Sequence, residues 1–247
     1  MQTISLEAIE AFVAEHIPAF HQNRIDKLKQ LRLKTVLRRK NPYLFRAKNI
    51  TIAGDFVKTI LDAYLSSQEE TLFGGFMEAL AQFVCHTVYG GQKSSAEGVD
   101  MEVEKDGIRY IISIKSGPNW GNSSQIKKMK DNFIKAMRIL KTNTLAQQKI
   151  IAVNGCCYGQ EAQPDKGGYL KLCGQSFWTF ISGDDKLYTD IIKPLGHKAK
   201  EKNEQFAAEY VKVANTFTLE FLQEFCGQDG AILWQKLIAF NSGNRDS

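Results

Sequence analysis

Residues 98–115 predict a β-hairpin. Two runs of strand-forming residues flank a turn at Lys105-Asp106-Gly107. Successive side chains on a strand project to opposite faces, so Ser113 and Lys115 share one face, while the neighbouring isoleucines enter the core. The first strand begins with Asp100. A carboxylate and a lysine beside a polar strand position are the side chains needed to hold a divalent metal and an attacking water.

Composition places few limits on this chain. With 247 residues and 43% apolar side chains, it can bury a proper core. Residues 1–4 show no leader pattern, and no segment approaches the roughly 18 apolar residues of a membrane span. We therefore expect a cytoplasmic protein without membrane contact. The five cysteines are an odd number without CxxC spacing and the four histidines are scattered, which argues against disulfides and zinc.

The charges are unevenly distributed. Residues 24–48 contain ten basic residues against a single acid, and a second basic cluster follows at 127–141. Between them, residues 69–104 run acidic, with only Lys93 opposing. Basic flanks around an acidic centre suit a polyanion held against a metal site. The alternative is that these are ordinary charged helix surfaces.

Hydrophobic periodicity predicts helices at both ends of the chain and a mixed centre. A first helix starts at Ser5 and stops near Pro18, the basic run is helical up to Asn41-Pro42, and a new helix starts at Ser66. After the hairpin we expect a loop and a helix, and then two strands and a helical tail. The expected positions are 117–124 for the loop, 125–140 for the helix, 148–154 and 177–181 for the strands, and 184–193, 201–225 and 231–240 for the tail.

These elements indicate one α/β (α+β) domain over residues 1–247. Its expected parts are a basic helical region at 1–65, a core at 66–183 and a helical tail at 184–247. No repeat, low-complexity stretch or linker divides the chain.

Asp100, Ser113 and Lys115 form a permissive pattern whose context makes it more specific. Gly-Val precedes the aspartate, the second strand reads Ile-Ile-Ser-Ile-Lys, and a Gly/Asn/Trp loop follows directly. This arrangement resembles the PD-(D/E)XK nuclease superfamily and, within it, the type II restriction endonucleases. The resemblance extends over residues 66–159 and includes EETLFGGFME, GQKSSAEGVD and IKSGPNWGN.

The resemblance implies a mixed central sheet flanked by helices, and a site-specific enzyme that cleaves double-stranded DNA with Mg²⁺, leaving 5′-phosphate and 3′-hydroxyl ends. Asp100 matches the metal-binding aspartate, Lys115 matches the lysine, and Ser113 stands where the second acid usually stands. It also implies a homodimer that cuts both strands of a palindrome and a separately encoded DNA methyltransferase.

The sequence departs from this pattern in two places. Val99 replaces a proline, which has no chemical role, and Ser113 replaces a carboxylate. Mg²⁺ prefers six oxygen ligands and is underligated by Asp100 and the Ile114 carbonyl alone. Another acid should therefore enter the site, as in related enzymes that recruit a helix glutamate.

Three acids are candidates for this ligand. Glu78 is the first, because it lies on the preceding amphipathic helix next to core-facing Met77; the alternative is a solvated glutamate. Glu102 is the second, since it shares a strand face with Asp100, and Asp131 is the third.

The loop after the hairpin carries amides and a tryptophan suited to DNA contact, although its glycines and proline equally suit a fixed turn. The residues expected to bind DNA are Lys93, Ser116, Asn119, Trp120, Asn122, Gln125, Arg38, Arg39 and Lys40. Cys156, Cys157 and Tyr158-Gly159 follow the next strand and either line the same cleft or pack in the core.

Two other functions remain open. The chain could be a structure-specific or repair nuclease of the same superfamily, or a catalytically inactive DNA-binding module that lacks the second acid. For Lys115 itself, the alternative is an exposed strand lysine paired with Glu102 or Glu104 across the hairpin. RNA is a less suitable substrate because no aromatic RNA-binding pattern is present.

Overall fold

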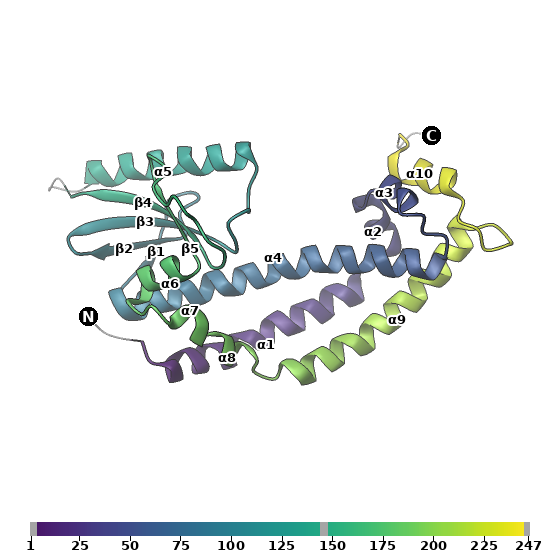
Figure 1. Ribbon diagram of the computed structural model, residues 1–247, viewed down its shortest axis with the longest axis horizontal. Helices are drawn as coiled ribbons and strands as arrows, with labels where there is room; N and C mark the ends of the chain where they lie inside the picture. Colours follow the sequence, from purple (N-terminus) through teal and green to yellow (C-terminus); the bar gives the residue numbers. More distant parts are fainter. Residues whose placement is uncertain (1–3, 144–147, 245–247) are drawn as a thin grey trace. The chain divides into compact units, whose positions relative to one another are not determined.

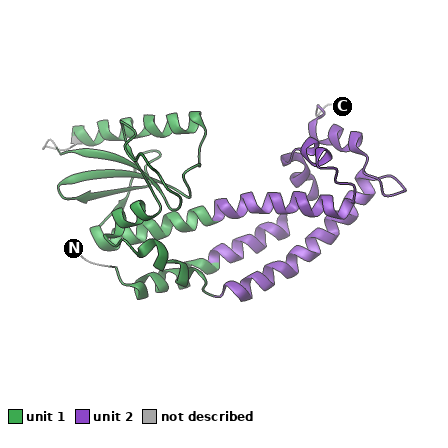
Figure 2. Cartoon of the chain, viewed as in Figure 1, with its two compact units in different colours: residues 1–18, 73–197 green, residues 19–72, 198–247 purple. Residues whose placement is uncertain are grey.

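The computed structural model describes residues 4–143 and 148–244. The chain forms two compact units (Figure 2), one built from residues 1–18 and 73–197 and the other from residues 19–72 and 198–247. Residues 1–3, part of the segment read for a leader pattern, lie outside the described ranges. The expectation of a single domain over 1–247 stays a prediction.

The first unit contains a five-stranded mixed sheet (Figure 1) with the spatial order β1-β2-β3-β4-β5. The first three strands are antiparallel, whereas β3, β4 and β5 run parallel. The strands are β1 (Gln92–Lys93), β2 (Met101–Lys105), β3 (Ile108–Lys115), β4 (Ile150–Cys156) and β5 (Leu170–Cys173). This confirms the predicted hairpin and the predicted strand at 148–154.

The hairpin turn has the backbone that its sequence favours. Asp106 and Gly107 both have positive φ angles, 54° and 74°, as a two-residue turn compatible with strand twist requires. The register pairs Met101 with Ile112 and Lys105 with Ile108. Extending this register by one residue sets Asp100, at the start of β2, beside Ser113 of β3.

Helices cover both faces of the sheet. The helix α5 (Ser123–Asn143) lies along one face (Figure 1), where Met129 and Phe133 pack against Ile111 and Ala152 of the strands. On the other side lie α6 (Gln175–Ser182) and the end of α4 (Ala53–Tyr89). Both faces of β3 are therefore buried at Ile111 and Ile112, neighbouring apolar residues whose side chains project to opposite faces.

The remaining helices complete the two units. The short helices α7 (Leu187–Asp190) and α8 (Ile192–Leu195) belong to the first unit. The second unit has its own aromatic core, in which Phe56 stacks on Phe221 and meets Trp234 edge-on. Its helices include α2 (Leu33–Arg39), α3 (Pro42–Ala47), α9 (Ala199–Phe225) and α10 (Trp234–Ser242). The chain has an α+β, restriction-endonuclease-like fold.

Two predicted helix boundaries were wrong. The helix α1 (Leu6–Gln30) continues through Pro18, because buried apolar side chains on either side of the proline keep the helix packed. No new helix starts at Ser66, since α4 is continuous there. The Ser67 hydroxyl donates to the Ala63 carbonyl within that helix and does not cap it.

The predicted strand at 177–181 was also wrong, because these residues lie in α6. Phe177, Trp178 and Ile181 are buried together, a spacing that fits one face of a helix as well as a strand run. Gly183, with a φ angle of 74°, ends the helix in the left-handed conformation. Two short strands, β1 and β5, were not predicted.

The cysteines are free thiols, and all except Cys226 are buried. Within the described ranges, no helix is both long and apolar enough to cross a membrane.

Candidate active site

Asp100 immediately precedes β2, and its carboxylate contacts residues near the end of β3. Its Oδ2 accepts a hydrogen bond of 2.6 Å from the backbone N–H of Ile114 and a longer one, 3.4 Å, from the Ser113 hydroxyl. The Lys115 ammonium is 3.6 Å from the same oxygen. Within the described residues these three donors all approach Oδ2 rather than Oδ1.

Lys115 ends β3 and pairs with Asp100, in contrast to the alternative in which it pairs with Glu102 or Glu104. Its ammonium also donates to the Ile114 carbonyl at 2.8 Å. Asp100 and the Ile114 carbonyl are the two oxygens that the resemblance assigns to a metal. The ammonium therefore supplies positive charge between the same two groups.

Ser113 is buried, with 2% of its surface accessible. Opposite it on β4 lies Asn154, which is also buried and donates to the Ser113 carbonyl at 3.2 Å. The same amide accepts a hydrogen bond of 3.1 Å from the indole of Trp120. These hydrogen bonds link Trp120, Asn154 and the Ser113 backbone, next to Lys115 in sequence.

Glu78 comes to this site from α4. Gln82, one turn further along the helix, donates to the Glu78 carboxylate at 3.3 Å and to the Asp100 backbone carbonyl at 3.4 Å. Burial raises the pKa of Glu78, and the negative charge of Asp100 raises it further, while Lys115 and Lys93 act in the opposite direction. A carboxylate whose pKa is raised by burial and by a neighbouring carboxylate is a natural place for a cation.

The other two acids are differently placed. Glu102 accepts a 2.6 Å hydrogen bond and ion pair from Arg109 on Oε2 and a 2.6 Å hydrogen bond from Ser94 on Oε1, so both of its oxygens already have donors. Asp131 is exposed on α5. In the described parts of the chain, no group of three or more His, Cys, Asp or Glu residues gathers as a metal cluster. A metal at Asp100 would therefore rely on two carboxylates and a carbonyl.

Two of the predicted DNA-binding amides form the start of α5. The Asn122 side chain accepts from the Gln125 N–H at 3.1 Å, and the Gln125 side chain accepts from the Asn122 N–H at 2.9 Å. This reciprocal arrangement is a helix cap that uses both carbonyl oxygens. Asn119 and Lys93 are exposed, and Ser116 is half-buried at the end of β3.

The predicted DNA-binding residues of the basic run belong to the second unit. The Arg38 guanidinium lies over the Phe240 ring at 5.0 Å, and Arg39 lies over Tyr64 at 5.9 Å. The Lys40 ammonium donates to the Ala63 carbonyl at 2.6 Å. These contacts fix the side chains against the helices of their own unit, and both arginines remain exposed.

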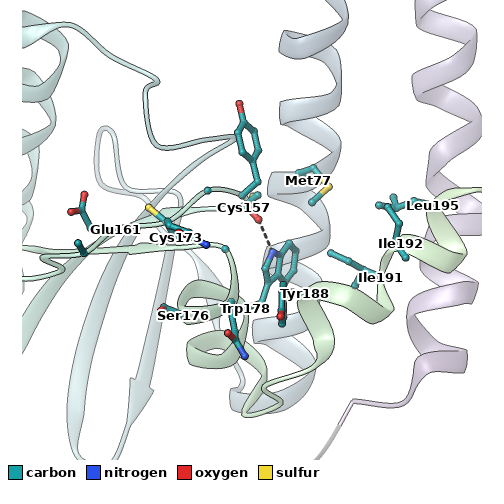
Figure 3. Close-up of a pocket in the computed structure, with 16 residues that line it drawn as sticks. Met77, Cys157, Glu161, Cys173, Ser176, Trp178, Tyr188, Ile191, Ile192 and Leu195 are labelled. Atoms are coloured by element: carbon teal, nitrogen blue, oxygen red, sulfur yellow. Dashed lines mark hydrogen bonds between the residues drawn. The ribbon is translucent and has the colours of Figure 1, made fainter.

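A cavity of about 880 Å³ opens at the carboxyl ends of β4 and β5, lined among others by Cys157, Tyr158 and Met77 (Figure 3). Cys156, by contrast, is fully buried. The Cys157 carbonyl accepts a 2.8 Å hydrogen bond from Trp178, which anchors α6. Burial, together with the charge of Glu78, raises the pKa of the Cys157 thiol to about 12, so it packs as a neutral side chain.

Glu161, at the edge of the same cavity, connects its own loop to β5. Lys166 and Lys171 contact its carboxylate at 3.0 and 3.2 Å, and Lys171 also donates to the Pro118 carbonyl. These donors, Lys166 above all, lower the pKa of Glu161 to about 2. A Cβ at Gly117 would overlap the Tyr158 ring, so the loop after β3 and the loop after β4 pack closely.

The chain matches a known protein family over most of its length. Residues 7–203 match the family model of the type II restriction endonuclease EcoO109I. The chain belongs to this family. Comparison with curated proteins gives no match. Membership in the EcoO109I family identifies the chain as a restriction endonuclease, an enzyme that hydrolyses DNA.

The sequence did not predict three residues that hold the active site and the neighbouring cavity in place. Gln82 was detectable as a polar side chain one helical turn from Glu78, and Asn154 as the polar residue after an apolar strand run. Glu161 had no comparable signal, because its partners lie on a loop and a strand whose proximity depends on the fold.

Proposed function

We propose that this protein is a site-specific endonuclease that cleaves double-stranded DNA by Mg²⁺-dependent hydrolysis. The observation that carries the proposal is the meeting of Asp100, the Ile114 carbonyl and Lys115 at the end of β3, with Glu78 beside them. The EcoO109I family supplies the substrate class.

The oxygen donors fit Mg²⁺. Two carboxylates and a backbone carbonyl are hard ligands, and Mg²⁺ in proteins is usually held by one or two carboxylates with waters completing the shell. Asp100 Oδ1, the Ile114 carbonyl and Glu78 would hold the ion, and Glu78 would replace the acid that Ser113 lacks. When bound, Mg²⁺ lowers the pKa of water and offsets charge that develops on the phosphate.

Each side chain then has a distinct task. Lys115 orients the attacking water and a non-bridging phosphate oxygen, since its ammonium faces Asp100. Water attacks phosphorus in line with the departing 3′ oxygen, and the products carry 5′-phosphate and 3′-hydroxyl ends. Ser113 supports Asp100 through its hydroxyl, which is a role a buried serine can fill without charge.

DNA binding involves residues of both units in this proposal. Near the hairpin we assign contacts to Lys93, Ser116, Asn119, Asn122 and Gln125, and in the second unit to Arg38, Arg39 and Lys40. Cleavage of both strands of a palindrome calls for a C2 homodimer. We further infer that the enzyme acts in the cytoplasm beside a separately encoded methyltransferase that protects host DNA.

A cleavage assay on unmethylated phage DNA tests the proposal. We expect discrete fragments from the wild-type protein with Mg²⁺, and intact DNA with EDTA or with Lys115→Ala. Lys236→Ala, which removes an exposed lysine of α10, is the matched control and should cleave normally. Intact DNA under all conditions, with retained binding, would favour the inactive DNA-binding module. Cleavage only at junctions or flaps would favour a structure-specific nuclease.

A further inference from the structure

Trp120 is held in place on two sides. Its ring packs against the apolar cluster that joins α5 to the sheet, and its indole N–H donates to Asn154 at 3.1 Å. The ring also lies 5.5 Å from the Lys115 ammonium. A cation at this distance from an aromatic ring is attracted by the electrons of the ring face.

Asn154 is buried in β4 with 1% of its surface exposed, where an apolar residue would be usual. A buried amide is costly unless both of its ends form hydrogen bonds. Here the oxygen accepts from Trp120 and the nitrogen donates to the Ser113 carbonyl. Because an indole only donates and a carbonyl only accepts, these partners fix the orientation of the amide. Asn154 therefore ties the loop that carries Trp120 to the strand that carries Lys115.

Lys115 itself has a flexible four-carbon side chain. Among the described residues, its ammonium contacts two oxygen atoms, Asp100 Oδ2 at 3.6 Å and the Ile114 carbonyl at 2.8 Å. Both would also be ligands of the metal in the proposed function, so metal binding competes for the groups that orient the ammonium. The Trp120 ring is a third neighbour that a metal does not use.

We infer that Trp120 is a positioning residue for Lys115, and that Asn154 fixes Trp120 in the orientation this role requires. The inference rests on the proposed function. It assigns Trp120 to the lysine rather than to DNA, and it gives a reason for a buried asparagine in an otherwise apolar strand. A side chain that acts through Lys115 affects the chemical step, whereas one that contacts DNA affects affinity.

A series of ring substitutions separates these roles. Trp120→Phe keeps an aromatic face and loses the N–H, Trp120→Leu loses both, and Asn154→Leu removes the anchor while keeping the ring. Tyr43→Leu, which removes an exposed aromatic side chain of α3, is the control. Each variant is measured for single-turnover cleavage with Mg²⁺, for DNA affinity without Mg²⁺, and for thermal melting, which shows whether it is folded.

We expect Trp120→Leu and Asn154→Leu to cleave about 10- to 30-fold more slowly, and Trp120→Phe about threefold more slowly, as loss of a cation–π contact predicts. DNA affinity should stay within about twofold of the wild type. Partial rescue by phenylalanine is the signature of a ring–cation contact. If Trp120→Leu does not fold, the Phe and Asn154 variants still give the comparison.

Two results would overturn the inference. One is a folded Trp120→Leu variant that cleaves at the wild-type rate. The other is a loss of affinity that accounts for the whole loss of activity, which would make Trp120 a DNA contact. Failure of the proposed function looks different, because the wild-type protein itself would then leave DNA intact.

Discussion

The hairpin at 98–115 and the basic segment at 24–48 both carry dense charge but hold it in different ways. In the hairpin, strand register brings Asp100 and Lys115 together, and the surrounding helices half-bury them. In the basic segment, Arg38 and Arg39 lie on aromatic rings of their own unit and stay exposed. Charges fixed by a sheet can hold a reacting group, whereas exposed charges attract a polyanion. The sequence alone does not separate these two cases.

The largest contrast between the two regions should come from Asp100→Asn. This change removes the negative charge that faces Lys115 and the proposed metal, and we expect cleavage to fall by about 10³-fold or more. DNA affinity without Mg²⁺ should be retained. Rates from single-turnover assays and affinities from fluorescence anisotropy measure the two effects, with Glu104→Gln, an exposed hairpin acid, as the control. A wild-type cleavage rate in Asp100→Asn would show that the active site does not lie at the hairpin.

Two glutamate variants distinguish the candidate metal ligands of the first unit. Glu78→Gln should slow cleavage by about 10²-fold and raise the Mg²⁺ concentration needed, because it removes a proposed ligand. Glu102→Gln should leave the Mg²⁺ requirement unchanged but cost about 1–2 kcal/mol of stability through loss of the Arg109 contact. Mg²⁺ titrations of cleavage and urea unfolding measure these effects. If Glu102→Gln raised the Mg²⁺ requirement while Glu78→Gln left it unchanged, Glu102 would be the ligand.

Gln82→Leu should have a smaller effect of the same kind. Without the amide, Glu78 loses the hydrogen bond that orients it toward Asp100, and we expect about a tenfold loss of cleavage rate. Gln205→Leu, a change on α9, is a matched control outside the site. An increase in the Mg²⁺ requirement would attribute the loss to Glu78, whereas an unchanged rate and Mg²⁺ requirement would show that Gln82 does not position it.

The double variant Arg38→Ala/Arg39→Ala tests the basic segment. If these arginines contact phosphates, DNA affinity should fall several-fold, and the dependence of log affinity on log salt should weaken by about one unit per contact. The rate at which the enzyme–DNA complex cleaves its DNA should not change. A loss of rate at saturating enzyme would contradict the distinction between the two regions.

Glu161→Gln should have the smallest effect, visible as pH-dependent stability. The pKa of Glu161 is lowered from its ordinary 4.5 to about 2, so its ion pairs stabilise the fold fully above pH 4.5. This contribution is lost as the pH falls through about 2. The difference in melting temperature between wild type and variant should therefore be largest near neutral pH and shrink below pH 4.5. A constant difference from pH 7 to pH 3 would show that the carboxylate charge has no such role.

The sequence predicted the hairpin well because alternation, turn residues and β-branched content all agree there. It predicted the wrong structure for Phe177–Ile181, because a short apolar run fits a strand and a buried helix equally. Gln82 contacts Asp100, which is 18 residues away in the sequence. Asn154 contacts Trp120 and Ser113, which are 34 and 41 residues away. No local sequence pattern encodes such contacts. The candidate site was therefore predictable in its hairpin residues and only partly in the side chains that surround them.

The central claim is that Asp100, the Ile114 carbonyl and Glu78 hold a divalent metal beside Lys115. Crystals of the protein soaked with Mn²⁺ test this most directly through an anomalous difference map. We expect a peak bounded by these three groups in the wild type and none in Asp100→Asn. A Mn²⁺ peak at Glu102, or a wild-type site that excludes Glu78, would contradict it.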